Sequence, residues 1–223
     1  MIKILNYLFQ SIIIYSFFFI GKIMGINISR KIFSSLFFFI APIFKSKKII
    51  NSNLDIFSKR DSSINKEKII ADMWKNYGKT FIEYIFLNRL RKESSHIIFK
   101  GEKNLIQSVQ NGKPSIFISG HFANFELMSM EITKKNIPLA TIYRPLNNFF
   151  LNPFMEFLRK KYVCPNQIKK GINGVRETIE YIKKKHCIAL MIDQRVSEGE
   201  KVNFFDKSAL TTTLPAQLSI KFD

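Results

Sequence analysis

Three polar clusters stand out in the sequence because each directly follows a short apolar run. The first contains His121, the second Arg144, and the third Asp193, Gln194 and Arg195. Imidazole, guanidinium and carboxylate groups supply the base, the anion-binding group and the orienting acid of many group-transfer reactions. The spacing predicts one site built from residues that lie far apart in the chain.

The first cluster reads GHFANFE and places Glu126 five residues after His121. In a regular helix this separation turns the two side chains about 140° apart, because each residue advances by about 100°. If His121 instead lies on a turn between a strand and a helix, the Glu126 carboxylate can reach the imidazole. The two residues are then a general base and its orienting acid. The alternative is a turn histidine that hydrogen-bonds only to the backbone.

The apolar runs before the clusters have the composition of buried strands. They are SIFIS at 115–119, LATIY at 139–143 and CIALMI at 187–192. Helical patterns separate them, and the last helix has Val175, Ile179 and Ile182 on one face with Asn173 as its N-cap. Alternating strands and helices predict an α/β fold with a largely parallel sheet flanked by helices. Because ligand sites of such sheets lie beyond the carboxyl ends of the strands, the clusters should share one edge.

The N-terminal part of the chain is apolar enough to enter a membrane. Residues 4–20 approach the roughly 20 residues that cross a bilayer. No small-residue cleavage site follows, so we expect an uncleaved N-terminal membrane helix over residues 1–22. Basic residues are sparse before it and frequent after it, which places the rest of the chain on the cytoplasmic side. A buried core helix is the alternative.

A second apolar run at residues 32–44 is too short to span comfortably and is bracketed by basic residues. We interpret residues 23–62 as an interfacial helix with a basic connector, although a core helix explains the run about as well. Apolar residues at helical spacing predict one long helix over residues 65–90. Residues 63–223 then form the domain that carries the polar clusters.

The composition favours anionic partners without selecting one. The 223 residues include 35 Lys+Arg and 17 Asp+Glu, for a formal charge of +18. A bias toward Lys, Ile, Asn and Phe from an AT-rich genome explains part of this excess. The chain lacks the interleaved aromatic and basic residues typical of nucleic-acid binding. Two cysteines without a framework and three histidines without zinc-site spacing predict a reducing compartment and no metal site.

Several ordered motifs resemble one enzyme family, the bacterial lipid A biosynthesis acyltransferases, which are lauroyl and myristoyl transferases. The resemblance covers essentially the whole chain. The motifs are MWKNYGKTFIEY at 73–84, SGHFANFEL at 119–127, YRPLNN at 143–148, DQR at 193–195 and FFDKSALTTTLPA at 204–216. That family continues beyond the position of Asp223, so we expect a shortened member.

The resemblance implies a bacterial inner-membrane enzyme that moves an acyl chain from acyl carrier protein to a hydroxyl of a lipid A precursor, without a cofactor. His121 matches the catalytic histidine of the family and Glu126 its acidic partner. Arg144 matches an arginine block, and Asp193 with Gln194 matches a DQ block, which we interpret as substrate-binding.

The roles expected for this chemistry follow from acyl transfer. His121 accepts the hydroxyl proton, and backbone N–H groups near Phe122 and Ala123 stabilise the oxyanion. Arg144 binds a phosphate of the acceptor or of the phosphopantetheine arm, or else forms a salt bridge with Asp193. Two other functions stay open, an acyltransferase for another glycolipid or an amino-lipid, and a membrane-tethered basic binding protein without catalysis.

Overall fold

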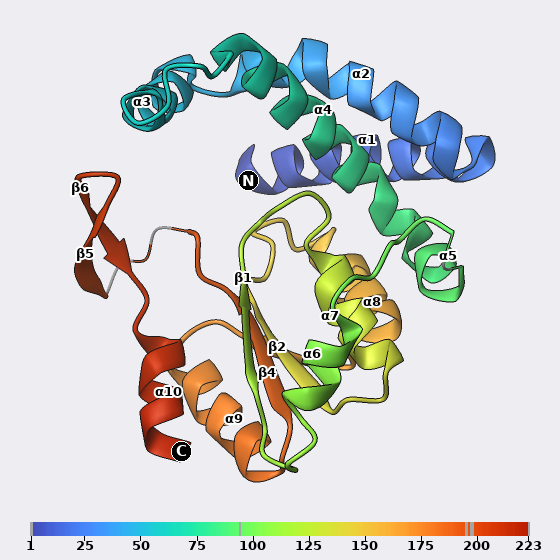
Figure 1. Ribbon diagram of the computed structural model, residues 1–223. Helices are drawn as coiled ribbons and strands as arrows, with labels where there is room; N and C mark the ends of the chain where they lie inside the picture. The colour runs from blue at the N-terminus through green and yellow to red at the C-terminus, as the bar shows by residue number, and fades with distance from the viewer. Residues whose placement is uncertain (1, 94, 195, 197–198, 223) are drawn as a thin grey trace. The chain divides into compact units, whose positions relative to one another are not determined.

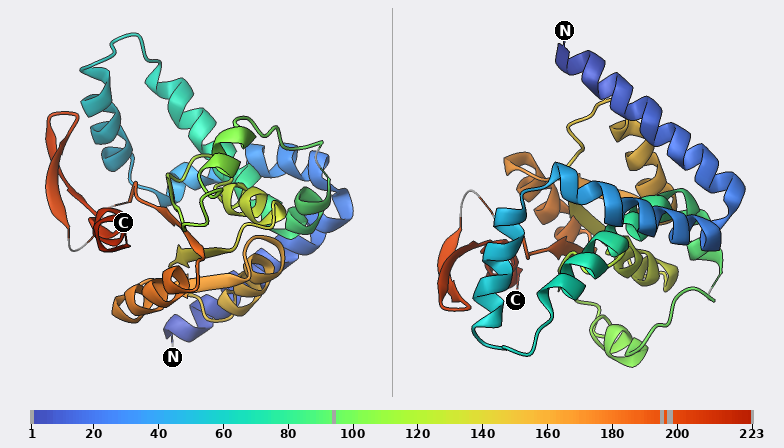
Figure 2. Two further views of the ribbon diagram at one scale, coloured as in Figure 1. Left: turned by 60° about the horizontal axis from the view of Figure 1, so that its bottom comes forward. Right: turned by 90° about the horizontal axis from the view of Figure 1, so that it is seen from above.

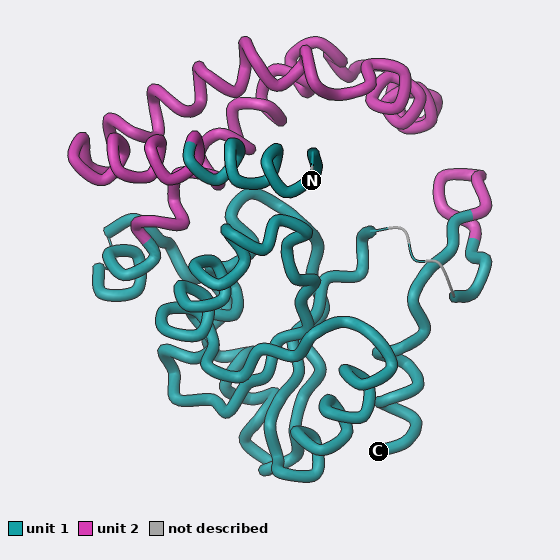
Figure 3. Tube along the Cα trace, turned by 180° about the vertical axis from the view of Figure 1, so that it is seen from behind, with its two compact units in different colours: residues 1–12, 87–202, 209–223 teal, residues 13–86, 203–208 magenta. Residues whose placement is uncertain are grey.

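The computed structural model describes residues 2–93, 95–194, 196 and 199–222. The chain divides into two compact units (Figure 3). Unit 1 comprises Met1–Ile12, Leu87–Val202 and Ala209–Asp223, and unit 2 comprises Ile13–Phe86 and Asn203–Ser208. The helices and strands in chain order are α1 (Ile2–Met24), α2 (Ile26–Phe44), α3 (Lys47–Ser58), α4 (Lys66–Glu83), the 3-10 helix η1 (Tyr84–Phe86), α5 (Leu87–Lys92), α6 (Glu102–Gln107), β1 (Ile116–Ser119), α7 (Glu126–Lys134), β2 (Leu139–Tyr143), α8 (Asn152–Tyr162), β3 (Asn166–Lys169), α9 (Ile172–Lys183), β4 (Cys187–Met191), β5 (Glu200–Phe204), β6 (Lys207–Thr211) and α10 (Leu214–Phe222).

Unit 1 confirms the predicted α/β fold. Four parallel strands form a sheet in the order β1-β4-β2-β3, with α7 and α8 on one face and α9 and α10 on the other (Figure 1). Side chains that alternate along the strands build the core under α9 and α10, including Ala140, Ile168, Ile188 and Leu190. The three predicted strands are present, and the structure adds β3, which pairs with β2.

Helix α9 corrects one detail of the sequence analysis. Its N-cap is Gly171, so Asn173 lies inside the first turn and does not cap the helix. The buried face contains Gly174, Thr178 and Ile182, whereas Val175 is exposed. A small residue and a hydroxyl that bonds the Gly174 carbonyl let the helix approach the sheet closely. Apolar periodicity therefore located this face in part, because Ile182 is buried and Ile179 packs against the core.

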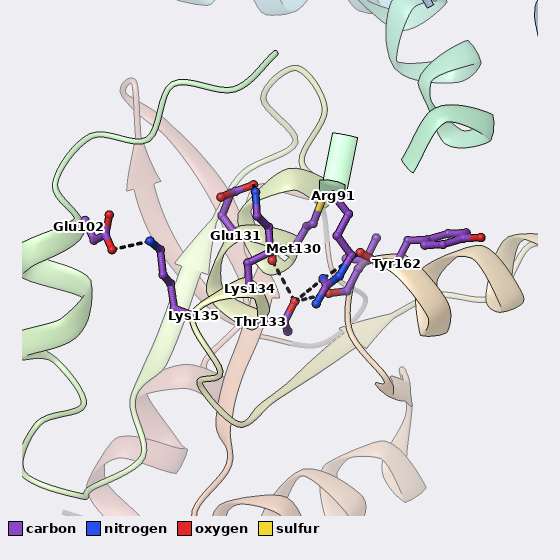
Figure 4. Close-up of polar contacts among 9 residues, drawn as sticks. Arg91, Glu102, Met130, Glu131, Thr133, Lys134, Lys135 and Tyr162 are labelled. Carbon is purple, nitrogen blue, oxygen red and sulfur yellow. Dashed lines mark hydrogen bonds and ion pairs between the residues drawn. The ribbon is translucent and has the colours of Figure 1, made fainter. Parts of the chain in front are cut away.

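Hydrogen bonds tie α7 to α5 and to the end of α8 (Figure 4). Arg91 Nη1 donates to Thr133 Oγ1 at 3.0 Å and to the Tyr162 carbonyl at 3.1 Å. The Thr133 hydroxyl donates to the Val163 carbonyl at 2.7 Å. The ion pair of Lys135 with Glu102 joins α6 to the end of α7. These contacts fix the helix that begins at Glu126.

In unit 2, α2 packs along α4. The pair includes a partly buried salt bridge from Arg30 Nε to Glu83 Oε1 at 2.7 Å and a contact between the tilted rings of Phe33 and Phe81. The predicted helix over residues 65–90 is not continuous, because the 3-10 turn η1 separates α4 from α5. Asn65 caps α4 by accepting a hydrogen bond from the Lys68 amide.

Helices α2 and α4 approach each other closely at Gly78. A Cβ atom there would stand 2.1 Å from the Phe33 carbonyl oxygen, which is backbone and cannot rotate away. Alanine normally stabilises a helix interior by about 0.5–1 kcal/mol over glycine. We expect Gly78→Ala to destabilise unit 2 instead, by about 2 kcal/mol, because the helices must separate. Denaturant unfolding of the full chain in detergent, followed by helical circular dichroism, measures this change.

A matched control for Gly78→Ala is Ser35→Ala, at an exposed position of α2. That variant should unfold within about 0.5 kcal/mol of the unsubstituted chain. A Gly78→Ala chain as stable as the control would show that the two helices do not pack this closely.

Helices α1 and α2 are both long and apolar enough to cross a membrane, with 23 and 19 residues, and few of their side chains are buried. The second apolar run, expected to be too short, belongs to a helix that begins at Ile26. The face of α2 opposite its buried residues carries exposed apolar side chains at helical spacing, which are Ile28, Ile32, Phe39 and Ile43. Length and composition therefore fit membrane contact for both helices.

Strands β5 and β6 form a separate two-stranded sheet, seen from two further directions in Figure 2. Phe205 and Asp206 turn the chain with positive φ angles of 51° and 58°, as in a type I′ turn. Asp206 accepts two hydrogen bonds from Arg60, and the Phe205 ring meets the Phe57 ring edge-on. Contacts with Phe57 of α3 and with Arg60, which follows α3, hold these two residues in this conformation.

Candidate functional site

The carboxyl ends of the parallel strands open into one cavity with both polar and apolar walls. His121, Arg144 and Gln194, which follow β1, β2 and β4, all line it. Its volume is about 530 Å³, and Glu126 of α7 also faces it. The sheet order makes β4 the neighbour of both β1 and β2, so three clusters that are distant in sequence meet at one edge, as the sequence predicted.

The imidazole of His121 is held by the carboxylate of Asp193. Its Nδ1 atom lies 2.7 Å from Asp193 Oδ1, and the His121 backbone N–H donates to Asp193 Oδ2 at 2.7 Å. On the other side of the ring, Nε2 lies 3.3 Å from the Gln194 amide nitrogen. The ring also contacts Phe125 edge-on, with 4.6 Å between centroids. One carboxylate thus fixes both the backbone and the ring of His121.

The protonation pattern follows from these contacts. Burial opposes the charged form of Asp193, but the hydrogen bonds from the His121 backbone and ring outweigh it, so the pKa of Asp193 lies below its ordinary value. The ionised carboxylate accepts a hydrogen bond from Nδ1–H, which leaves the Nε2 lone pair facing the cavity and the Gln194 amide. This tautomer can accept a proton from a bound hydroxyl group.

The loop between β1 and α7 is shaped around this contact. A Cβ atom on Gly120 would stand 3.1 Å from Asp193 Oδ2 and 2.8 Å from the Phe122 ring, so glycine gives the carboxylate room. Ala123 has a positive φ of 46°. The Phe122 N–H, expected as an oxyanion donor, donates instead to the Gly120 carbonyl at 2.8 Å.

Glu126, the first residue of α7, faces the same cavity with a different partner. Its Oε1 atom accepts a hydrogen bond from Arg159 Nε at 2.7 Å, and both side chains are largely buried. The hydrogen bonds described for the His121 ring go to Asp193 and Gln194. Breaking such a buried ion pair strands a charge and is costly.

Arg159 is a cavity residue that the sequence did not single out. It belongs to the basic run FLRKKY of α8, and its guanidinium lies 5.7 Å from the centre of the Tyr143 ring. A run of several basic residues gives no sign of which one turns inward. Helical phase relative to the buried Met155 and Leu158 was the available signal.

Arg144 extends from the end of β2 into the cavity. Its Nη2 atom lies 3.5 Å from Asn147 Oδ1. The sequence offered Asp193 as an alternative partner of Arg144. Among the described residues, Asp193 forms an ion pair with His121 and not with Arg144. The third residue of the DQR motif, Arg195, falls outside the described residues.

A hydrogen-bond network supports the segment that carries Arg144. The Tyr143 hydroxyl donates to Glu156 Oε1, the Asn152 amide donates to the same carboxylate, and the Leu146 N–H donates to Asn152 Oδ1. Burial, together with the hydrogen bond to Glu156, raises the pKa of the Tyr143 hydroxyl, whereas the bond from Tyr143 lowers the pKa of Glu156. Helix α8 therefore fixes the loop after β2.

A base held by an acid, beside cationic groups in an open cavity, is an arrangement suited to proton transfer from a hydroxyl nucleophile. Among the described side chains, no group of three or more His, Cys, Asp or Glu could hold a metal ion. Comparison with known proteins adds the decisive observation. The family model described as bacterial lipid A biosynthesis acyltransferase matches residues 2–223.

The chain belongs to the bacterial lipid A biosynthesis acyltransferase family. The resemblance noted in the sequence motifs is thereby confirmed over essentially the whole chain. Membership of the lipid A acyltransferase family makes the chain an acyltransferase with a lipid A-type acceptor. None of the curated proteins compared with it matches.

Proposed function

We propose that the chain transfers a fatty acyl group from acyl carrier protein to a hydroxyl group of a lipid A precursor. The observation that carries this proposal is the Asp193–His121–Gln194 contact at the edge of the cavity, where Nε2 is available as a base. An alcohol is a weak nucleophile at neutral pH, so a base that removes its proton during attack is what the reaction requires.

In the proposed reaction, His121 Nε2 takes the proton of the acceptor hydroxyl while the hydroxyl oxygen attacks the thioester carbonyl. The tetrahedral intermediate then collapses, the carbon–sulfur bond breaks, and the thiolate leaves with the proton from the imidazolium. The products are an ester and a free thiol, so atoms and charges balance. Asp193 holds the ring in the required tautomer and stabilises the imidazolium.

Glu126 is proposed as the second acid of the catalytic site. Its carboxylate lies in the cavity wall beside Phe125, which contacts the imidazole. From there its negative charge favours the imidazolium, and its ion pair orients Arg159. Arg144 and Gln194 are the proposed substrate-binding groups. The Gln194 amide lies beside Nε2, and in the proposed complex the acceptor hydroxyl replaces it as the hydrogen-bond partner of Nε2.

We further propose that the enzyme lies at the bacterial inner membrane with the cavity on the cytoplasmic side, where acyl carrier protein is available. The length and exposed apolar surface of α1 and α2 support membrane attachment. The basic residues that follow α1 support the orientation, because positive charges are retained on the cytoplasmic side.

An acylation assay tests the proposed function. The full chain in detergent, mixed with acyl carrier protein bearing a fatty acid and with a tetra-acylated lipid A precursor, should yield a product heavier by one acyl group in mass spectrometry. Parallel reactions with other glycolipids and amino-lipids as acceptors should give less product. Absence of acylated lipid A precursor, with turnover of one of the other acceptors, would overturn the proposed acceptor.

A further inference from the structure

Two basic residues follow β2 and β3 at neighbouring positions of the backbone. Tyr143 pairs with Lys169 in the parallel register, and the Lys170 N–H donates to the Tyr143 carbonyl at 2.8 Å. Neighbouring strands run about 4.8 Å apart. The residues that come next, Arg144 and Lys170, therefore leave the sheet next to each other, and both line the cavity.

The charges of this pair are not balanced within the described part of the chain. None of the ion pairs formed there includes Arg144 or Lys170, and the polar contact of Arg144 is with the neutral Asn147 amide. Glu126 is committed to Arg159, and Glu156 lies 3.7 Å from Lys169. A cavity wall with two adjacent positive charges concentrates the electrostatic field and attracts an anion.

The two side chains suit one kind of anion. A guanidinium offers two parallel N–H donors to a pair of oxygens, and a lysine ammonium adds a mobile point charge. A tetrahedral phosphate carries enough oxygens to meet both at once. A single carboxylate has only two oxygens and would leave one of the cations poorly matched.

We propose that Arg144 and Lys170 together bind a phosphate group of the substrate. Lys170 is thus a specificity-determining residue beside the substrate-binding Arg144. Identification of the phosphate rests on the proposed function, because both substrates contain one. The acceptor carries phosphate on its sugars, and the donor carries a phosphodiester in its prosthetic arm. A phosphate bound at the carboxyl ends of β2 and β3 would fix the position of the substrate relative to His121.

Steady-state kinetics of Lys170→Met tests the site. We expect KM for the phosphorylated partner to rise about tenfold, because one charge-assisted hydrogen bond is lost, with kcat within about twofold. Lys170→Arg should restore most of the affinity. The matched control is Lys113→Met, which removes the same charge from the exposed turn before β1, at the opposite edge of the sheet.

Two kinetic arms identify the source of the phosphate. A rise in KM for the lipid acceptor that disappears with a dephosphorylated acceptor assigns the site to the sugar phosphate. A rise in KM for the acyl donor alone assigns it to the phosphodiester of the prosthetic arm. Unchanged KM values for both substrates in Lys170→Met, or equal effects in Lys113→Met, would overturn the proposal.

A binding measurement separates this inference from the proposed reaction. Titration calorimetry of the full chain in detergent with inorganic pyrophosphate requires no turnover. Lys170→Met should weaken pyrophosphate binding about tenfold and Lys113→Met should not. Lys170-dependent binding in a chain that fails the acylation assay would preserve the phosphate site and reject the reaction. Equal binding by both variants would reject the site even if acylation proceeds.

Discussion

Replacing His121 by alanine should reduce acyl transfer by at least about 10³-fold. The substitution removes the only group in the described cavity that combines a proton-accepting nitrogen with a carboxylate partner, and general-base catalysis contributes about 10²–10⁴ in rate. The loss should appear in kcat, because the imidazole acts on the transition state. Mass spectrometry of the acylated lipid after timed reactions measures the rate.

The control for His121→Ala is His186→Ala. His186 precedes β4 at the opposite end of the strand, and its ring Nδ1 lies 3.2 Å from the Lys184 carbonyl. This variant should retain the activity of the unsubstituted chain. Turnover by His121→Ala within about tenfold of that activity would remove His121 from the catalytic role.

Asparagine at position 193 should cost the enzyme about 10²–10⁴ in kcat while the chain still folds. The amide has nearly the shape of the carboxylate, but it carries no charge to stabilise the imidazolium. It can also present its N–H₂ group to Nδ1, which moves the ring proton to Nε2 and removes the base. The measurement is kcat of Asp193→Asn in the same acylation assay, beside Asp206→Asn as an isosteric control in the β5–β6 turn.

Acid sensitivity provides a second readout for Asp193. Its pKa is lowered in the folded chain, so its stabilising contribution is present above the unfolded pKa and is lost as the pH falls through the folded value. Asp193→Asn should therefore lose less stability on acidification than the unsubstituted chain. An Asp193→Asn enzyme with normal kcat would show that another acid, such as Glu126, orients the imidazole.

The sheet and the edge that carries the polar clusters could be predicted from the sequence because the relevant signals are local. Compact apolar runs marked β1, β2 and β4, and a polar cluster ended each of them. Strand β3 was not predicted because its sequence, NQIK, has a single apolar residue, Ile168. The identity of β3 as a strand depends on pairing with β2, which is a contact between distant segments.

The contacts of the site were harder to predict for the same reason. The short spacing of His121 and Glu126 suggested a direct pair, yet the ring meets Asp193, which lies 72 residues away. Glu126 forms an ion pair with Arg159, 33 residues away on another helix. Partner choice among carboxylates depends on the sheet order and the loop path, which single-sequence periodicity does not contain.

Both the backbone N–H and the ring Nδ1 of His121 are bound to the carboxylate of Asp193, so the two hydrogen bonds are expected to break together. Any opening of the β1–α7 loop that frees the backbone amide from Oδ2 also removes the aspartate from the imidazole. The amide proton of residue 121 can therefore exchange with solvent only while the hydrogen bonds to Asp193 are broken. Under the proposed mechanism, the rate of that exchange measures the fraction of time in which Asp193 is released from the imidazole.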